Sequence, residues 1–235
     1  MIEDAYTNWY LVQDNGSLTV VDTGHPRSWA SLHEALALLG KTPDAVEAVV
    51  LTHAHYDHMG FARRAREELG VPVLAHEQEL PVVRRPWHYD HERSRLRYVR
   101  NLPFLRVFAA MGTQGALWTR GIDDPETYAA GEELDVPGRP HAVYSPGHTY
   151  GHCALALPER GVLIAGDAVV MLDPYTGREG PCIVAGAATA DSRMNLDSLD
   201  ALAATGADTV LTGHGEPWTG GVEPMVERAR AAGTA

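Results

Sequence analysis

The segment LTHAHYDHMG, residues 51–60, places three histidines and one aspartate within six positions. His53, His55, Asp57 and His58 are too many polar groups for one buried turn unless they find partners there. A metal ion is one such partner, because imidazole nitrogens and carboxylate oxygens are common ligands of zinc. A solvated loop that happens to be rich in histidine is the other interpretation, and the rest of the sequence decides between the two.

The surroundings of this segment favour a ligand-binding loop. The β-branched run at residues 45–52 predicts a strand that leads directly into it, and residues 59–70 predict the helix that follows. Loops at strand ends often carry ligand and metal sites in α/β proteins. His53 and His55 are two positions apart and point the same way on extended backbone. The loop thus offers two ligands to each of two adjacent metals, and its ligand types suit zinc and also iron or manganese.

Further candidate ligands follow three other predicted strands. His148 stands in SPGHTYGH, Asp167 in LIAGDAVV and His214 in LTGHGEPW. A single polar residue after a strand is usually a structural, hydrogen-bonded group. The conjunction of three such residues with the histidine-rich loop favours a metal centre.

The chain alternates short strands with helices, which predicts an α/β fold. Strands are expected at residues 8–13, 17–22, 45–52, 71–76, 140–145, 153–158, 161–166 and 208–213. Helices are expected at residues 28–40, 59–70, 191–204 and 222–232.

The composition excludes several classes of protein. A net charge of −12 argues against a protein whose main work is binding nucleic acid. Two cysteines are too few for a disulfide framework, and no segment resembles a signal peptide or a membrane span. A cytoplasmic protein without a membrane partner is the expectation, and the oligomeric state stays open.

The positive charge of the chain is concentrated in one segment. Residues 84–106 contain seven arginines against only Asp90 and Glu92, so this segment carries +5 and the remainder −17. The segment falls within the long interval between His58 and His148, which also contains several large apolar residues.

Taken together, the motifs resemble those of the metallo-β-lactamase-fold hydrolases. The matching elements are His53-Ala-His55-Tyr-Asp57-His58, Gly147-His148-Thr149, Gly166-Asp167, Gly213-His214 and the early Asp22-Thr23-Gly24. The resemblance extends from about residue 7 to 218. It implies an αββα sandwich over residues 1–235, with the metals at one edge between the two sheets. Residues 77–135 are then a helical insertion beyond the minimal fold.

The resemblance also implies a scheme of ligands for two zinc ions per chain, with iron or manganese as alternatives. His53, His55 and His148 would hold one metal, Asp57, His58 and His214 the other, and Asp167 would bridge them. Asp57 and Asp167 would also act in catalysis, through a hydroxide shared by the metals. Asp22 is expected to orient a ligand from outside the metal shell, or only to form a turn.

Differences from individual branches of the family narrow the range of reactions that this chain is expected to catalyse. The glyoxalase II-like and lactonase-like branches fit best, which predicts a dinuclear zinc hydrolase (thioesterase or lactonase) acting on an ester, thioester or lactone. His58 and Asp167 depart from the β-lactamase pattern, and phosphodiesterase activity is also less favoured. Val170 stands where the lactonases carry a tyrosine, although Tyr175 is near. The alternative is a mononuclear iron enzyme that resembles the persulfide dioxygenases and oxidises sulfur.

The insertion has two compatible interpretations. It is a helical subdomain with its own small core and a solvated basic face, or a lid whose aromatic residues contact an acyl chain. In the second case its arginines bind an anionic handle of a small or carrier-bound acyl substrate, such as phosphopantetheine, coenzyme A or a carboxylate. Arg93, Arg97 and Arg100 are the residues predicted for that role.

Overall fold

The N-terminal half of the chain forms a six-stranded sheet in the computed structural model, which describes residues 1–234. Its strands are β1 (Ile2–Asp4), β2 (Thr7–Asp14), β3 (Ser17–Val21), β4 (Val46–Val50), β5 (Val73–His76) and β6 (Glu126–Tyr128), in that order. The first three pair antiparallel, and β3 to β6 run parallel to one another.

The second sheet has four strands in the order β12-β9-β8-β7. These are β7 (His141–Tyr144), β8 (Cys153–Leu157), β9 (Val162–Gly166) and β12 (Thr209–Thr212). A separate hairpin of β10 (Val170–Leu172) and β11 (Glu179–Cys182) follows β9. Because β7 and β9 both pair antiparallel with β8, and β12 pairs parallel with β9, three of the four strands point the same way.

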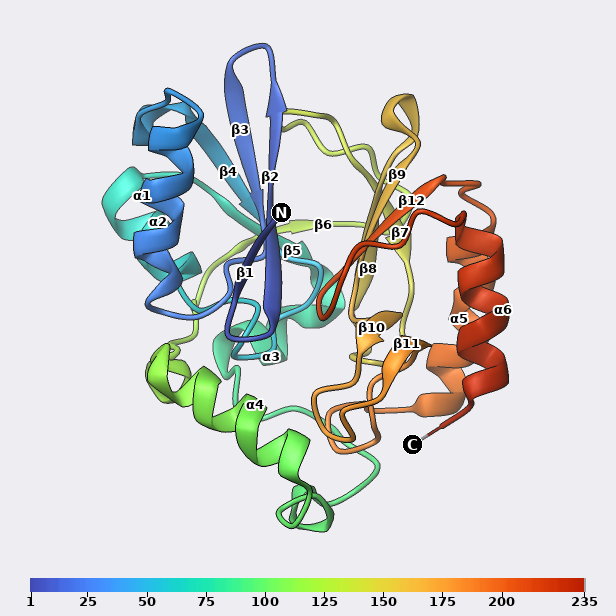
Figure 1. Cartoon of the computed structure of the whole chain (residues 1–235). Coiled ribbons are helices and arrows are strands. Elements are labelled where there is room, and N and C mark those ends of the chain that lie inside the picture. Colours follow the sequence, from blue (N-terminus) through green and yellow to red (C-terminus); the bar gives the residue numbers. More distant parts are fainter. Residues whose placement is uncertain (235) are drawn as a thin grey trace.

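Helices cover the outer face of each sheet (Figure 1). The first sheet carries α1 (Ser28–Leu38) and α2 (Ala62–Leu69), and the second carries α5 (Ser192–Ala203) and α6 (Val222–Ala232). This arrangement confirms the predicted αββα sandwich. No helix within residues 1–234 combines the length and the apolar character needed to cross a lipid bilayer.

Three hydrophobic cores hold the four layers together. The core between the sheets includes Tyr10, Val21, Val50, Leu155 and Ile164. The core beneath α1 and α2 is built around Trp9, Leu32 and Phe61, and the core beneath α5 and α6 around Leu163, Leu199 and Met225. Each large buried side chain contributes about 1.5–3 kcal/mol relative to exposure, so the sandwich is a stable platform for the loops at its edge.

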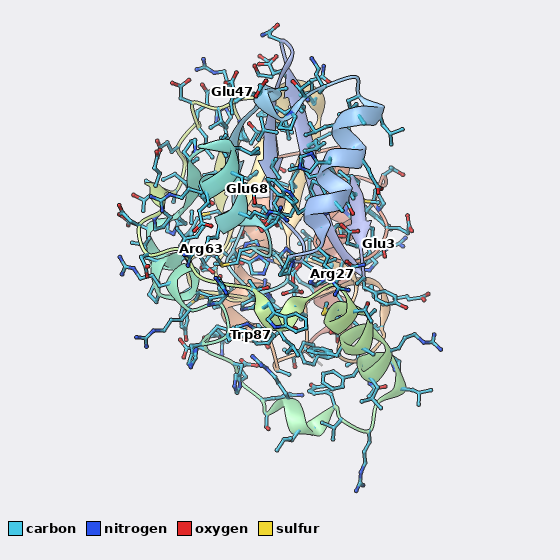
Figure 2. The ribbon with its side chains drawn as sticks, turned by 90° about the vertical axis from the view of Figure 1, so that its left-hand side faces the viewer. Glu3, Arg27, Glu47, Arg63, Glu68 and Trp87 are labelled. Carbon is cyan, nitrogen blue, oxygen red and sulfur yellow. The ribbon has the colours of Figure 1, made fainter. Side chains whose placement is uncertain are left out.

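The segment predicted as a helical insertion, residues 77–135, contains α3 (Leu80–Arg84), α4 (Leu102–Thr113) and three short 3₁₀ turns. It also contains β6, which pairs with β5 and therefore belongs to the first sheet. In Figure 1, α4 lies beneath the two sheets, and in Figure 2 Trp87 lies in the lower part of the molecule, to the left of the green helix.

Some of the apolar residues of the insertion pack on the rest of the molecule. Val107 and Met111 of α4 share a cluster with Tyr56 of the histidine-rich loop, whose ring stacks on Trp87 at 3.9 Å between ring centroids. Tyr98 and Phe104 pack instead on the segment around Tyr175. The insertion therefore lies over the loop end of the sheets, and its buried apolar residues belong to clusters shared with the main body. Other apolar residues of the insertion, such as Leu96, Leu102 and Trp118, are exposed.

Candidate metal centre

The histidine-rich loop begins directly after β4 and ends at α2. Its backbone makes a tight turn, because the amides of His58 and Met59 both donate to the carbonyl of His55, at 2.9 and 3.2 Å. Gly60 then passes so close to the DTGH segment that a Cβ atom there would lie 2.2 Å from the carbonyl carbon of His25. Glycine is required at that position, and this close approach fixes where the loop leaves the sheet.

The remaining candidate ligands come from the second sheet. His148, Asp167 and His214 follow β7, β9 and β12 respectively. Since these three strands point the same way, their C-terminal ends lie at one edge and bring the three side chains together.

Hydrogen bonds join the two sheets at this edge. The amide of Cys153 donates to the carbonyl of Thr52 at 2.9 Å, and the amide of Asn8 donates to that of Gly213 at 2.8 Å. The side-chain amide of Asn8 also donates to the carbonyl of Thr212 at 2.9 Å. These contacts hold the loops from both sheets in fixed positions relative to each other.

The first ligand group is His53, His55 and His148. One ligand atom from each lies within 4.8 Å of the other two, and all three residues are buried. Nε2 of His148 faces Nδ1 of His55 at 3.0 Å. Burial lowers the pKa of all three imidazoles, to about 4 for His148, which favours the neutral form that binds metals.

The second ligand group is Asp57, His58 and His214, again within 4.8 Å. Oδ2 of Asp57 is 3.9 Å from Nε2 of His58 and 3.6 Å from Nε2 of His214. The group combines one carboxylate with two imidazoles, a common donor set for a divalent cation.

Asp167 lies between the two groups. Its Oδ2 is 3.4 Å from Nε2 of His148 in the first group and 3.2 Å from Nε2 of His214 in the second. Burial favours the neutral acid, but His214, His58 and His148 outweigh it and hold the pKa of this carboxyl well below its usual range. In turn, although burial opposes it, Asp167 and Asp57 raise the pKa of His58 to about 10. The cluster is a place where positive charge is stabilised.

Several buried polar atoms of the cluster lack a hydrogen-bond partner, a situation that a bound metal would relieve. Nε2 of His53, Nε2 of His58 and Oδ1 of Asp167 are buried without any hydrogen-bond partner among the described residues. Polar atoms in that situation cost free energy unless a cation is bound among them. A Cβ atom on Gly213 would lie 1.9 Å from Oδ1 of Asp167, so the glycine keeps the space beside that carboxylate open.

A second layer of contacts orients the histidines. Thr52 Oγ1 lies 3.1 Å from Nδ1 of His53, and His214 donates from Nδ1 to the carbonyl of Tyr6 at 2.6 Å. The Nε2 atoms are thereby directed toward the centre of the cluster.

Asp22 has the orienting role predicted for it. Its carboxylate accepts hydrogen bonds from the amide and the hydroxyl of Thr52, both at 2.8 Å, and Oδ2 lies 3.1 Å from Nδ1 of His58. Its backbone has a φ of 56°, a left-handed conformation that aspartate tolerates better than most residues. Asp22 therefore both forms the turn and orients His58.

The structure brings all seven predicted ligands into one cluster, while their binding of metal stays a prediction. Two supporting residues were missed. Glu79 is buried and accepts from the amide of Ala54 at 2.9 Å and from Thr149 Oγ1 at 2.8 Å, so it ties together two ligand loops. Burial raises its pKa to about 7. His152 accepts at Nε2 from the amide of Asp167 at 3.1 Å.

Sequence signals for these two residues are unequal. His152 ends the GHTYGH motif and could have been found there. Glu79 stands among ordinary polar residues and gives no such signal.

A small pocket opens over the cluster. Its volume is about 10 Å³, which is room for about one water molecule. Its lining comprises the ligands His55, Asp57, Asp167 and His214, the tyrosines 56, 89 and 175, and the apolar residues Phe108, Met111, Pro174, Val184 and Ala188. The side facing the cluster is therefore polar, and the opposite side is aromatic and apolar.

Asp22→Asn is expected to weaken metal binding at the second ligand group about 10- to 100-fold, the usual effect of losing an orienting contact. Asparagine keeps one oxygen for the amide of Thr52 but loses the anionic acceptor beside His58. Titration against a chromophoric chelator measures the affinity, and thermal melting checks that the variant is folded. Asp44→Asn, at an exposed position, is the matched control. Equal affinities of the two variants would remove the orienting role from Asp22.

Comparison with known proteins gives consistent matches. The model of the metallo-beta-lactamase superfamily matches residues 2–214. The chain is 30% identical over 232 residues to "Probable metallo-hydrolase YflN" of Bacillus subtilis, covering 91% of this chain and 82% of that protein. It is 25% identical to a hydroxyacylglutathione hydrolase of Klebsiella pneumoniae, over 61% of this chain and 40% of that protein. A metallo-beta-lactamase family protein of Thermus thermophilus is 30% identical, with a TM-score of 0.70 and coverage of 96% of this chain and 74% of that one.

Proposed function

The chain belongs to the metallo-beta-lactamase superfamily, and we propose that within it this protein is a dinuclear zinc hydrolase that cleaves an ester, a thioester or a lactone. The observation that carries the proposal is the presence of two complete three-residue ligand groups on either side of Asp167. A single metal would need only one of these groups. The second would then leave Asp57 and two imidazoles buried together without a function.

The assignment of residues follows from the geometry. The first group would hold one cation and the second group the other, and Asp167 is within reach of both. Two bound divalent cations supply Lewis acidity toward the carbonyl oxygen of the substrate and lower the pKa of water. Asp22 and Glu79 keep the ligand loops in place through the hydrogen bonds described above.

The wall opposite the cluster would receive the substrate. Burial raises the pKa of Tyr175 well above its usual value and that of Tyr89 to about 12. Both phenols therefore stay protonated at neutral pH, and because they hydrogen-bond to each other, the pair can donate one hydroxyl hydrogen to a substrate oxygen. Phe108, Met111 and Val184 supply an apolar surface for carbon atoms and limit the entry of water.

The substrate class rests on comparison and on charge. One relative is named as a hydrolase of hydroxyacylglutathione, which is a thioester, although this chain spans only 40% of that protein. The net charge of this chain, −12, makes nucleic acid an unfavourable substrate for it. A small or carrier-bound acyl compound is the class that fits both observations.

The proposal is tested by metal analysis together with a substrate panel. Protein purified without added metal is expected to contain close to two zinc ions per chain. The zinc-loaded protein is expected to hydrolyse acyl thioesters, esters or lactones in preference to phosphodiesters and β-lactams. One iron per chain, with oxygen consumption in the presence of a persulfide, would instead establish the alternative of mononuclear sulfur oxidation.

A further inference from the structure

Arg95 lies next to the aromatic wall of the pocket. It belongs to the 3₁₀ turn Arg95–Arg97, and its guanidinium packs on the ring of Tyr89 with its central carbon 4.7 Å from the ring centroid. The same ring contacts the imidazole of His55, at 3.8 Å between centroids. One tyrosine ring thus connects the guanidinium to a candidate metal ligand.

The positive charge of Arg95 interacts electrostatically with residues that line the pocket. Although burial opposes it, Tyr89, Tyr175 and then Tyr56 and Asp57 raise the pKa of Arg95, and these four residues all line the pocket. Arg95 in turn contributes to lowering the pKa of His55. Its positive charge is therefore close to both the phenols and the ligand cluster.

Part of the hydrogen-bonding capacity of Arg95 is unused. Its Nε is buried and has no hydrogen-bond partner among the described residues, and the residue as a whole is half-buried. A half-buried guanidinium without a carboxylate partner is costly, because it has lost part of its hydration. A bound anion would restore the missing contact, and the planar guanidinium fits a carboxylate with two parallel hydrogen bonds.

We infer that Arg95, together with the hydroxyls of Tyr89 and Tyr175, forms a subsite for a carboxylate carried on the acyl part of the substrate. The inference rests on the proposed function for the reaction but concerns a different part of the site. Phe108 and Met111 line the pocket and would contact the carbon atoms between this carboxylate and the scissile carbonyl.

Arg95 is a different residue from the three arginines that the sequence indicated. Arg97 and Arg100 are exposed. The backbone of Arg93 is bound to the carbonyl of Gly186 at 2.8 Å. The guanidinium of Arg95, by contrast, packs on Tyr89, which lines the pocket.

The test compares matched thioesters of N-acetylcysteamine. The succinyl compound carries a terminal carboxylate, and the pentanoyl compound has a neutral chain of similar length. Arg95→Gln is expected to lower kcat/KM for the succinyl thioester about 10- to 100-fold, mainly through KM, since a hydrogen bond to a charged group is lost. The pentanoyl thioester should change less than about threefold, because Gln removes only the charge-assisted contact. Arg97→Gln and Arg100→Gln are the matched controls and should change neither substrate.

Other outcomes overturn the inference. An equal loss for the succinyl and pentanoyl thioesters would mean that Arg95 only supports Tyr89. Pentanoyl-coenzyme A is assayed as a third substrate, and a loss confined to it would mean that Arg95 binds an anion of the carrier and not of the acyl part. No loss for any substrate would remove Arg95 from recognition altogether.

A direct binding measurement separates this inference from the proposed function. If the zinc-loaded protein cleaves none of these thioesters, the proposed function fails, but the subsite can still be tested with succinate. Calorimetry should then give a dissociation constant at least about tenfold higher for Arg95→Gln than for the unmodified protein. Equal constants would overturn the subsite, since any direct binding of succinate to zinc is common to both proteins.

Discussion

Chelation is expected to abolish hydrolysis completely, and Zn²⁺ or Mn²⁺ is expected to restore it. The reason lies in the donor set: the ligand cluster contains five imidazoles and two carboxylates, and no other group among the described residues of the pocket is arranged to activate water. Activity is measured before chelation, after chelation and after each metal is added back. Full turnover in the chelated protein would contradict the mechanism.

Chelation should also lower the thermal stability of the protein. A ligand that binds only the folded chain stabilises it by about 4 kcal/mol at a concentration about 1,000 times its dissociation constant. The melting temperature should therefore fall on chelation and recover with metal. This second measurement separates loss of catalysis from irreversible unfolding.

The variant Asp57→Ala is expected to empty one of the two proposed metal positions and to leave the other occupied. It removes one ligand of the second group and leaves the first group intact. The purified variant should stay soluble and contain about one metal fewer per chain. Asp44→Ala, at an exposed position, is the control and should keep both metals.

Asp167→Asn is expected to lower kcat by about 10²-fold or more, the scale observed when a single electrostatic contact in an active site is lost. Its carboxylate is within 3.4 Å of both ligand sets, so in the proposed dinuclear site its charge would serve two metals at once. Asparagine has nearly the same size, and the amide of residue 167 still donates to His152. Folding should therefore suffer much less than catalysis.

The measurement combines kcat, metal content and thermal melting for Asp167→Asn. Asp200→Asn is a suitable control, because Asp200 is an exposed residue that pairs with Arg230. A variant of Asp167 with two bound metals and near-normal kcat would show that this residue does not connect the two positions.

The sequence determined the layers of the fold and the members of the ligand cluster. Period-two and helical patterns are local, and they identified eight of the strands and the four covering helices. The seven ligand residues were also visible, because His and Asp directly after a buried strand are unusual. The strands β1, β6, β10 and β11 were not predicted, because the first three have only three residues each and β11 contains Gly180 and Pro181, which are unusual in strands.

Only the tertiary structure decided which residues support and cover the cluster. Tyr6 contacts His214 from 208 positions away, and Glu79 contacts Ala54 from 25. Neither contact depends on a local motif, because the Tyr6 acceptor is a backbone carbonyl and Glu79 is an ordinary carboxylate.

The choice of Arg95 among the seven arginines of residues 84–106 was likewise settled by folding. The charge of that segment can be read from its residues, but which guanidinium meets Tyr89 depends on how the chain turns before α4. The candidate ligands could thus be identified from local sequence motifs, whereas the residues that surround them are brought there by long-range packing.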